Sequence, residues 1–134
     1  MAQADPPQIT GISPRAVRPG EAIDLTIQGK NLAGATQLWT SFPAEVALAP
    51  DVKDNGKLAD RVTYRVTATD PQTLGVHGLR LVSPEGVSPL AMVVVVDLPS
   101  LAQQPGNVTP DKAQPLSLPI AVDGVMPNLS RNYY

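Results

Sequence analysis

The sequence predicts an all-β protein, built as an antiparallel sandwich or barrel. The chain of 134 residues contains 15 prolines and 10 glycines, which disfavours a helical bundle because proline removes a backbone donor and glycine raises the entropy cost of a helix. Between residues 8 and 98, short segments of alternating apolar and polar residues are separated by Pro, Gly, Asn and Asp. That pattern is typical of antiparallel strands. A hydrophobic fraction of 43% suffices for a core.

The length allows one ordinary domain with an extension. We expect residues 1–7 to form an extended leader and residues 8–98 the β-sandwich. The composition then shifts, because prolines recur from residue 99 onward at a density that no central strand tolerates. We therefore expect residues 99–115 to be a Pro-rich linker. Residues 116–134 are expected to be an extra strand or the truncated start of a second β domain, with a strand candidate at 116–126.

The first strands are marked by alternation and by turn residues. Residues 8–13 predict a strand with a bulge near Gly11, because the two isoleucines stand three positions apart. Gly20 follows Pro19 at a turn position that favours positive φ. Residues 22–29 alternate over their whole length and predict a half-buried strand, and Leu32 is expected to fill the loop beyond it.

The middle of the sandwich is less regular. Residues 37–42 alternate, and we expect Leu38 and Phe42 to face inward. Two prolines enclose residues 44–49, which leaves too few residues for a stable helix and favours a short strand. Asn55-Gly56 predicts a tight hairpin turn of type I′, in which both corner residues need positive φ.

Two further strands and an apolar run follow. Residues 61–68 predict a second strongly alternating strand. In residues 76–82 we expect both leucines inward and both His77 and Arg80 toward solvent. The run 92–96, Met-Val-Val-Val-Val, lacks alternation and indicates a strand covered on both faces or one paired late in the fold.

With these strands placed, residues 8–98 resemble the IPT/TIG domain. The resemblance rests on Ile12-Ser13-Pro14, Pro19-Gly20, the alternating strand that ends at Gly29, Asn31-Leu32, and the late segment Glu85-Gly86-Val87-Ser88. It implies an immunoglobulin-like β-sandwich of about seven strands. Since the chain has no cysteine, such a domain lacks an inter-sheet disulfide and depends on its apolar stripes.

The segment from Gln104 to Val125 is similar to the opening of a bacterial pre-peptidase C-terminal domain, another β-sandwich. Its likeness lies in Gln104-Pro105-Gly106-Asn107 and in the alternation after Pro115. Together, the two resemblances imply a large, multi-domain, extracytoplasmic bacterial protein in which such modules act as spacers or binding platforms.

Charge and composition narrow the chemistry. A net charge of −2 offers no basic field for nucleic acid or an anionic membrane. No apolar stretch is long enough to cross a bilayer. Without cysteine and with one histidine, thiol catalysis and His-rich metal sites are excluded. His77 stands in no nucleophile motif, so we expect no enzymatic activity and no cofactor.

The candidate site residues fall into two groups. A weak calcium site is conceivable in one polar loop, but a lysine stands at the third position where a carboxylate belongs; its members are Asp51, Asp54, Asn55 and Asp60. Candidate interaction residues are Trp39, Tyr64, Arg65 and Arg80. For Trp39, Phe42 and Tyr64, packing in the core is favoured over an aromatic binding platform.

We therefore expect a non-enzymatic structural or interaction module of a larger secreted or cell-surface bacterial protein, a spacer or protein-binding platform. Two alternatives stay open: an accessory domain of a large extracytoplasmic enzyme or redox complex, and a carbohydrate-binding or adhesion module that uses Trp39 and Tyr64. The expected partners are other domains of the parent protein or separate proteins. Homo-oligomerisation by pairing of residues 116–126 with a neighbouring copy is a further alternative.

Overall fold

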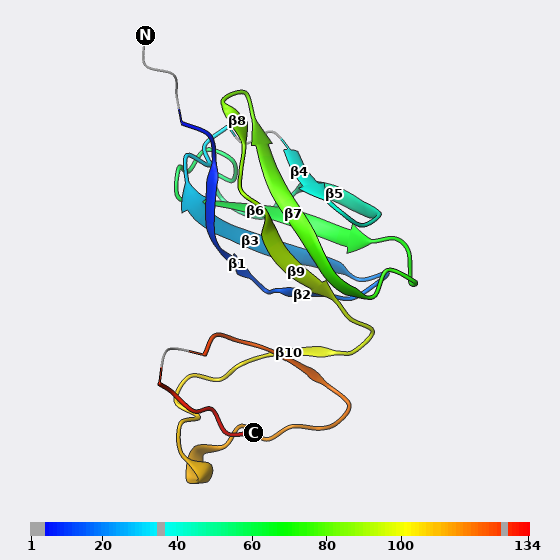
Figure 1. Ribbon diagram of the computed structural model, residues 1–134, viewed down its shortest axis with the longest axis vertical. Helices are drawn as coiled ribbons and strands as arrows, with labels where there is room; N and C mark the ends of the chain where they lie inside the picture. Colours follow the sequence, from blue (N-terminus) through cyan, green and yellow to red (C-terminus); the bar gives the residue numbers. More distant parts are fainter. Residues whose placement is uncertain (1–4, 35–36, 127–128) are drawn as a thin grey trace. The chain divides into compact units, whose positions relative to one another are not determined.

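The computed structural model describes residues 5–34, 37–126 and 129–134, so the expected leader lies largely outside the described residues. The chain divides into two compact units, Met1–Asp97 and Leu98–Tyr134. Within the described residues the regular elements are eleven strands and one short 3-10 helix (Figure 1). The all-β prediction is confirmed.

Two sheets build the first unit. Sheet A has the order β1-β3-β6-β5, and its strands are β1 (Gln8–Ser13), β3 (Ala22–Lys30), β6 (Arg61–Ala68) and β5 (Ala44–Leu48). Sheet B has the order β2-β9-β7-β4, with β8 paired to β7, and its strands are β2 (Ala16–Val17), β9 (Ala91–Val95), β7 (Gly75–Ser83), β4 (Gln37–Thr40) and β8 (Gly86–Val87). All pairings are antiparallel except that of β2 with β9.

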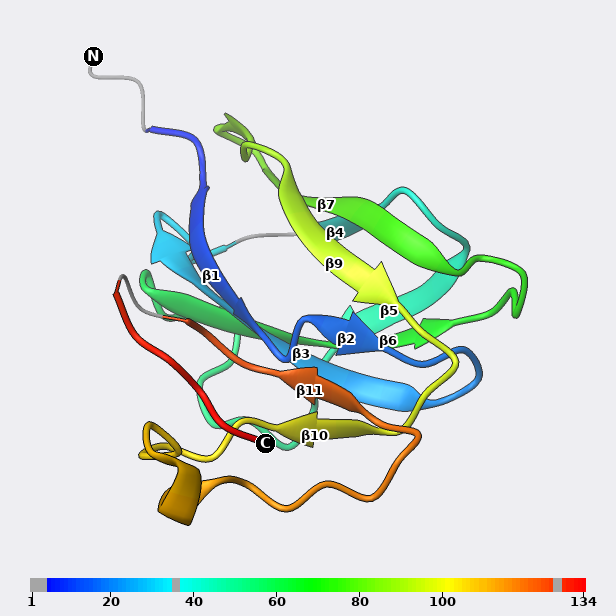
Figure 2. The same cartoon turned by 60° about the horizontal axis from the view of Figure 1, so that its bottom comes forward.

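The two sheets stack face to face (Figure 2), and their strand orders match those of an immunoglobulin-like sandwich. The chain enters through sheet A as β1 and then contributes β2 to the edge of sheet B. Seven strands have four or more residues, and the two-residue strands β2 and β8 complete the unit. The immunoglobulin-like prediction is confirmed.

The core forms because alternate residues of both sheets point into the space between them. Its fully buried members include Leu25, Ile27, Leu79, Leu81, Val93 and Val95. Burying a side chain of this size stabilises the fold by about 1.5–3 kcal/mol. Leu32, Leu38 and Phe42 are buried as expected, and the ladder of β1 shifts register between Ile9 and Gly11, where a bulge was predicted.

The predicted turn at Asn55-Gly56 is wrong. A long loop, residues 49–60, joins β5 to β6, and its positive φ angles are at Asp54 (54°) and Gly56 (82°). The Asn55 side chain explains the difference. It donates to the carbonyls of Ala49 (3.0 Å) and Thr63 (2.7 Å) and accepts from the Thr63 N–H (2.9 Å). It thus continues the ladder of β6 beyond the end of β5, which a tight turn would prevent.

Of the two alternatives for residues 92–96, a strand covered on both faces is wrong. Met92 is 52% exposed, while its neighbour Val93 is fully buried. The strand therefore alternates in burial although its residue types do not. Its outward residues belong to a surface described below.

The second unit contains two three-residue strands, β10 (Ser100–Ala102) and β11 (Ala121–Asp123), which pair in parallel. The range expected as a linker thus holds β10 and the 3-10 helix η1 (Pro110–Lys112). The strand candidate at 116–126 reduces to β11, which pairs within its own unit. The Gln114 side chain is buried and donates to the Ala102 carbonyl (3.0 Å) and accepts from the Gln104 N–H (2.8 Å).

Candidate functional site

The two outward faces of the sandwich differ in chemistry. On sheet A, the outward residues of β3 and β6 are polar or charged except Ala22, and they pair across the strands as Asp24 with Arg65, Thr26 with Thr63, and Gln28 with Arg61. The Thr26 and Thr63 hydroxyls lie 3.1 Å apart. This face suits contact with water.

Arg65 lies at the centre of an ion-pair cluster on sheet A. Its Nε and Nη2 donate to the two oxygens of Asp24 at 2.8 and 3.0 Å, and Nη2 also reaches Asp51 at 3.4 Å. Hydrogen bonds from Arg65 lower the pKa of the Asp24 carboxyl below its ordinary value, more than partial burial raises it. The same bonds raise the pKa of Arg65. Both side chains of this bidentate pair are therefore charged across the physiological range.

The ion pair predicts a dependence of stability on acid pH. Because the pKa of Asp24 is depressed in the folded chain, the pair contributes stability above the unfolded pKa and loses it as pH falls through the folded pKa. Urea unfolding is therefore expected to show the wild type more stable than Asp24→Asn at neutral pH, with the two converging below pH 3.8. The effect is small, since the side chains are 39% and 41% exposed. Glu85→Gln, in an exposed turn, is the control; a gap that persists in strong acid contradicts the assignment.

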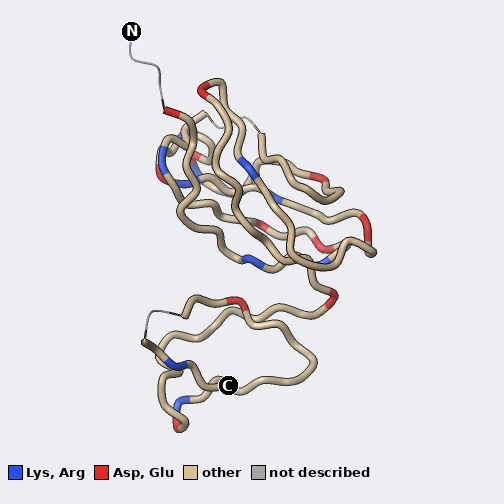
Figure 3. Tube along the Cα trace, viewed as in Figure 1, with Lys and Arg blue, Asp and Glu red and all other residues tan. Residues whose placement is uncertain are grey.

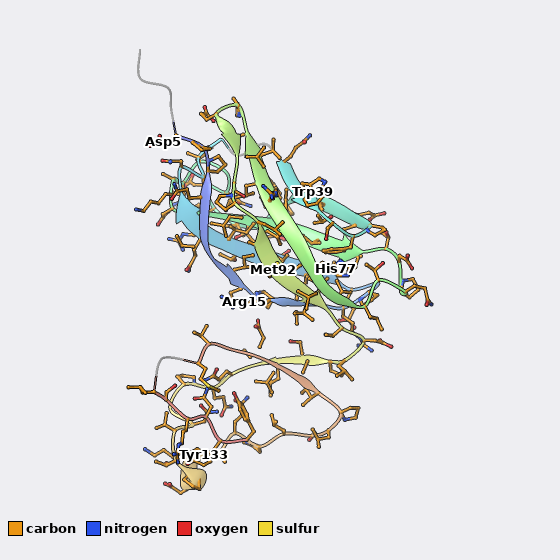
Figure 4. The ribbon with its side chains drawn as sticks, viewed as in Figure 1. Asp5, Arg15, Trp39, His77, Met92 and Tyr133 are labelled. Carbon is orange, nitrogen blue, oxygen red and sulfur yellow. The ribbon has the colours of Figure 1, made fainter. Side chains whose placement is uncertain are left out.

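Sheet B presents an apolar outer face. Its exposed members are Trp39 (50%), Val76 (63%), Leu90 (50%) and Met92 (52%), which we call the sheet B patch. Figure 4 labels Trp39 and Met92, which lie on the strands either side of β7. Gly78 lies between them, paired with Met92. A Cβ at Gly78 would come within 2.6 Å of Leu90, so Leu90 lies over this glycine.

The asymmetry extends beyond the patch. Among the described residues of the first unit, the exposed large apolar side chains outside it are Leu48, Leu74 and Val87. Leu74 directly precedes β7 and Val87 is paired with Val82 in sheet B. Only Leu48 belongs to sheet A. The apolar surface is thus concentrated on one sheet.

The expectation that Trp39 packs in the core is wrong, whereas Phe42 (4%) and Tyr64 (2%) are buried. Trp39 and Tyr64 nevertheless meet at one groove of about 440 Å³ between β4 and β5, with Val46 and Leu48 on its other side. Burial raises the pKa of the Tyr64 phenol. The groove therefore offers one exposed aromatic ring, not a two-ring platform.

His77 does not face solvent as expected. It stands two residues before Leu79 on β7 and so shares the inward face, where its ring packs on Phe42 with centroids 5.2 Å apart. Its Nδ1 lies 3.4 Å from the Ser41 hydroxyl, which already accepts the Gly78 N–H at 2.9 Å. Nε2 is buried and contacts no hydrogen-bonding partner among the described residues. The described part of the chain therefore places no orienting carboxylate on this histidine, and its contact with Ser41 lacks the third member of a nucleophilic triad.

The calcium candidates are not brought together around one point. Asn55 uses its side chain on the backbone of Ala49 and Thr63, and Asp51 contacts Arg65. Within the described ranges, no group of three or more histidine, aspartate or glutamate side chains is placed to hold a metal ion.

Charged residues of both signs are interspersed along the first unit (Figure 3). The three arginines of the long strands do not share one face, because Arg61 and Arg65 are on sheet A and Arg80 is on sheet B. Arg80 pairs across the strands with Trp39 and donates to the Ser88 carbonyl at 3.3 Å. It therefore places a positive charge beside the sheet B patch.

No family model and no curated protein sequence matches the chain. In the part of the chain that the structure describes, no helix has the length and apolar character needed to span a bilayer. The fold and surfaces define an immunoglobulin-like β-sandwich module with one polar and one apolar outer face.

Proposed function

We propose that this chain is a non-enzymatic interaction module that binds a protein partner through the sheet B patch. The observation that supports the proposal is the concentration of exposed large apolar side chains on the outward face of sheet B, whereas the outward face of sheet A is mainly polar or charged. Patches of contiguous apolar surface on soluble domains commonly mark contact sites, because exposing them to water is unfavourable.

The composition of the patch favours a protein surface as its occupant. Trp39 and Met92 are residue types enriched at protein interfaces, and Arg80 beside Trp39 is a third. The partner expected from this chemistry has an apolar centre and a carboxylate placed to meet Arg80.

The test uses a photoreactive amino acid at two matched positions. One replaces Val76 in the patch, and the other replaces Thr67 on the outward face of sheet A. In cells that make this chain, we expect a cross-link to a different protein from position 76 and none from position 67. Met92→Asp is expected to abolish the cross-link from position 76, because it buries a charge in the contact.

Equal cross-linking from both faces, or cross-linking that survives Met92→Asp, would overturn the proposal. A cross-link from position 76 only to a second copy of this chain would overturn the assignment of a different protein. Circular dichroism of each variant checks that the sandwich remains folded.

A carbohydrate-binding role is the second candidate, and the exposure of Trp39 at the β4–β5 groove favours it. Gln37, on the same strand, also lines the groove and supplies a polar group beside the ring, and sugars commonly stack on such rings. Trp39 emission should then shift when soluble oligosaccharides are added. An emission unchanged by a panel of neutral and acidic oligosaccharides counts against this role.

We further propose that the module belongs to a larger extracytoplasmic bacterial protein, in which it also acts as a spacer. The support is the resemblance of residues 8–98 to IPT/TIG domains. A role as accessory domain of an extracytoplasmic enzyme or redox complex fits the same features. Expression of the natural gene with an epitope tag, followed by cell fractionation, tests the location.

A further inference from the structure

The free edge of β5 has an orderly set of backbone hydrogen-bonding groups. The bonds from Thr69 N–H to the Pro43 carbonyl (3.0 Å) and from Ala49 N–H to the Thr63 carbonyl (3.1 Å) fix the ladder between β5 and β6. Because hydrogen-bonded pairs alternate along antiparallel strands, Glu45 and Ala47 also bond to β6. The backbone N–H and C=O groups of the intervening residues point to the free edge, away from β6. These residues are Ala44, Val46 and Leu48.

The other three edges of the sandwich are less suited to pairing. A bulge between Ile9 and Gly11 interrupts β1, and β2 has two residues. On β4, four residues long, the free-edge position Leu38 is buried. Short strands and bulges commonly prevent a sheet edge from pairing with another chain. β5 has five residues, an unbroken register with β6, and Glu45 as its one charged residue.

We propose that β5 pairs with β5 of a second copy of this chain, in antiparallel register about Val46. This register places Val46 opposite Val46 of the second copy and Ala44 opposite Leu48 of the second copy. The three residues whose backbone groups point to the free edge then exchange backbone hydrogen bonds with their counterparts. The two copies of sheet A become one continuous sheet, and the exposed side chain of Leu48 (44%) gains a neighbour.

Charge supports the same register. Glu45 and Ala47 point to the outward face, paired within the chain with Thr67 and Arg65. In the proposed pairing Glu45 lies opposite Ala47 of the second copy, so the two glutamates do not face each other. A register centred on Glu45 would oppose like charges, which is destabilising. The sequence of β5 is therefore complementary to itself in one arrangement.

A matched pair of substitutions at Ala47 tests the register in the full chain. Sedimentation equilibrium over a concentration series is expected to show reversible dimerisation of the wild type. Ala47→Glu places a carboxylate opposite Glu45 of the second copy twice and is expected to weaken the dimer by about tenfold, whereas Ala47→Lys strengthens it by about tenfold. Within one chain the two substitutions have the opposite effects on stability, because position 47 pairs with Arg65: glutamate there is favourable and lysine is unfavourable. A change in monomer stability therefore cannot imitate the result.

Amide hydrogen exchange supplies the second readout. At high concentration the Val46 and Leu48 amides should become protected, while those of Glu45 and Ala47 are protected at all concentrations. A chain that stays monomeric at its highest soluble concentration overturns the proposal. Equal changes of the dimerisation constant in Ala47→Glu and Ala47→Lys overturn it as well. Protection of Val46 only when a foreign protein is added identifies a heterologous strand and also overturns it.

This inference is independent of the function proposed for the sheet B patch. Met92→Asp, which should abolish the cross-link from position 76, is expected to leave the dimerisation constant unchanged. Loss of one interaction without the other therefore shows which of the two proposals fails.

Discussion

Replacing Gly29 with alanine is expected to destabilise the first unit by about 3 kcal/mol, because the added Cβ has no room against the backbone of the neighbouring strand. Gly29 lies in β3, paired with Ile9 of β1. A Cβ at this position would collide with the carbonyl oxygen of Gln8 and lie 2.9 Å from its carbonyl carbon. No side-chain rotation relieves a clash with main-chain atoms. β1 must therefore move, which disturbs its ladder and the burial of Ile12.

Urea unfolding followed by circular dichroism measures this loss, with Gly11→Ala as the matched control. Gly11 lies on the paired strand, and a Cβ there would meet Gln28 Oε1 at 3.5 Å, an ordinary contact. The control is expected to change the free energy of unfolding by less than about 0.5 kcal/mol. Equal losses for the two variants would contradict the close approach of β1 to Gly29.

Asn55→Ala is expected to lower the free energy of unfolding by about 2–3 kcal/mol. The substitution removes three hydrogen bonds to the backbone of Ala49 and Thr63. Each is worth about 1 kcal/mol, and a buried donor left without a partner adds a desolvation penalty. Thr63 is 4% exposed, so water does not readily replace the lost amide. Thermal and urea unfolding of the variant measure the loss.

Two further variants separate the hydrogen bonds from the general effect of changing this loop. Asn55→Asp keeps an oxygen for the Thr63 N–H but places a carboxylate against two carbonyl oxygens. Its loss in the free energy of unfolding should therefore be at least as large as that of Asn55→Ala. Asp54→Asn keeps a residue tolerant of positive φ and should be nearly neutral. If Asn55→Asp retains wild-type stability at neutral pH, the proposed role of the Asn55 donor is wrong.

Much of the fold could be predicted from local sequence rules. The alternation in residues 22–29 placed Leu25 and Ile27 in the core, and proline and glycine marked the turns, including Gly20 with its φ of +78°. These rules work because they depend on neighbouring residues alone. Sheet partners depend on distant residues, and here the family resemblance, not the periodicity, indicated the immunoglobulin-like order.

The misassigned residues share a physical cause, which is that a side chain's environment depends on another element. Trp39 is exposed because parity places it opposite Arg80, on the same face as Val76 and Met92. Strict parity along β7 would have placed His77 with Leu79 and revealed the outward Val76. The hydrogen bonds of Asn55 to Thr63 had no signal in the sequence, since they connect a loop to a strand eight residues away.

The second unit has an interior of a different kind from the sandwich. Its buried polar side chains are the amides of Asn107 and Gln114, while Leu118, Val125 and Met126 are exposed. The heat-capacity change on unfolding comes mainly from apolar surface that becomes hydrated, whereas polar surface lowers it. Unfolding of this unit should therefore contribute little heat capacity, so its free energy varies almost linearly with temperature. The two units of one chain then respond differently to cooling.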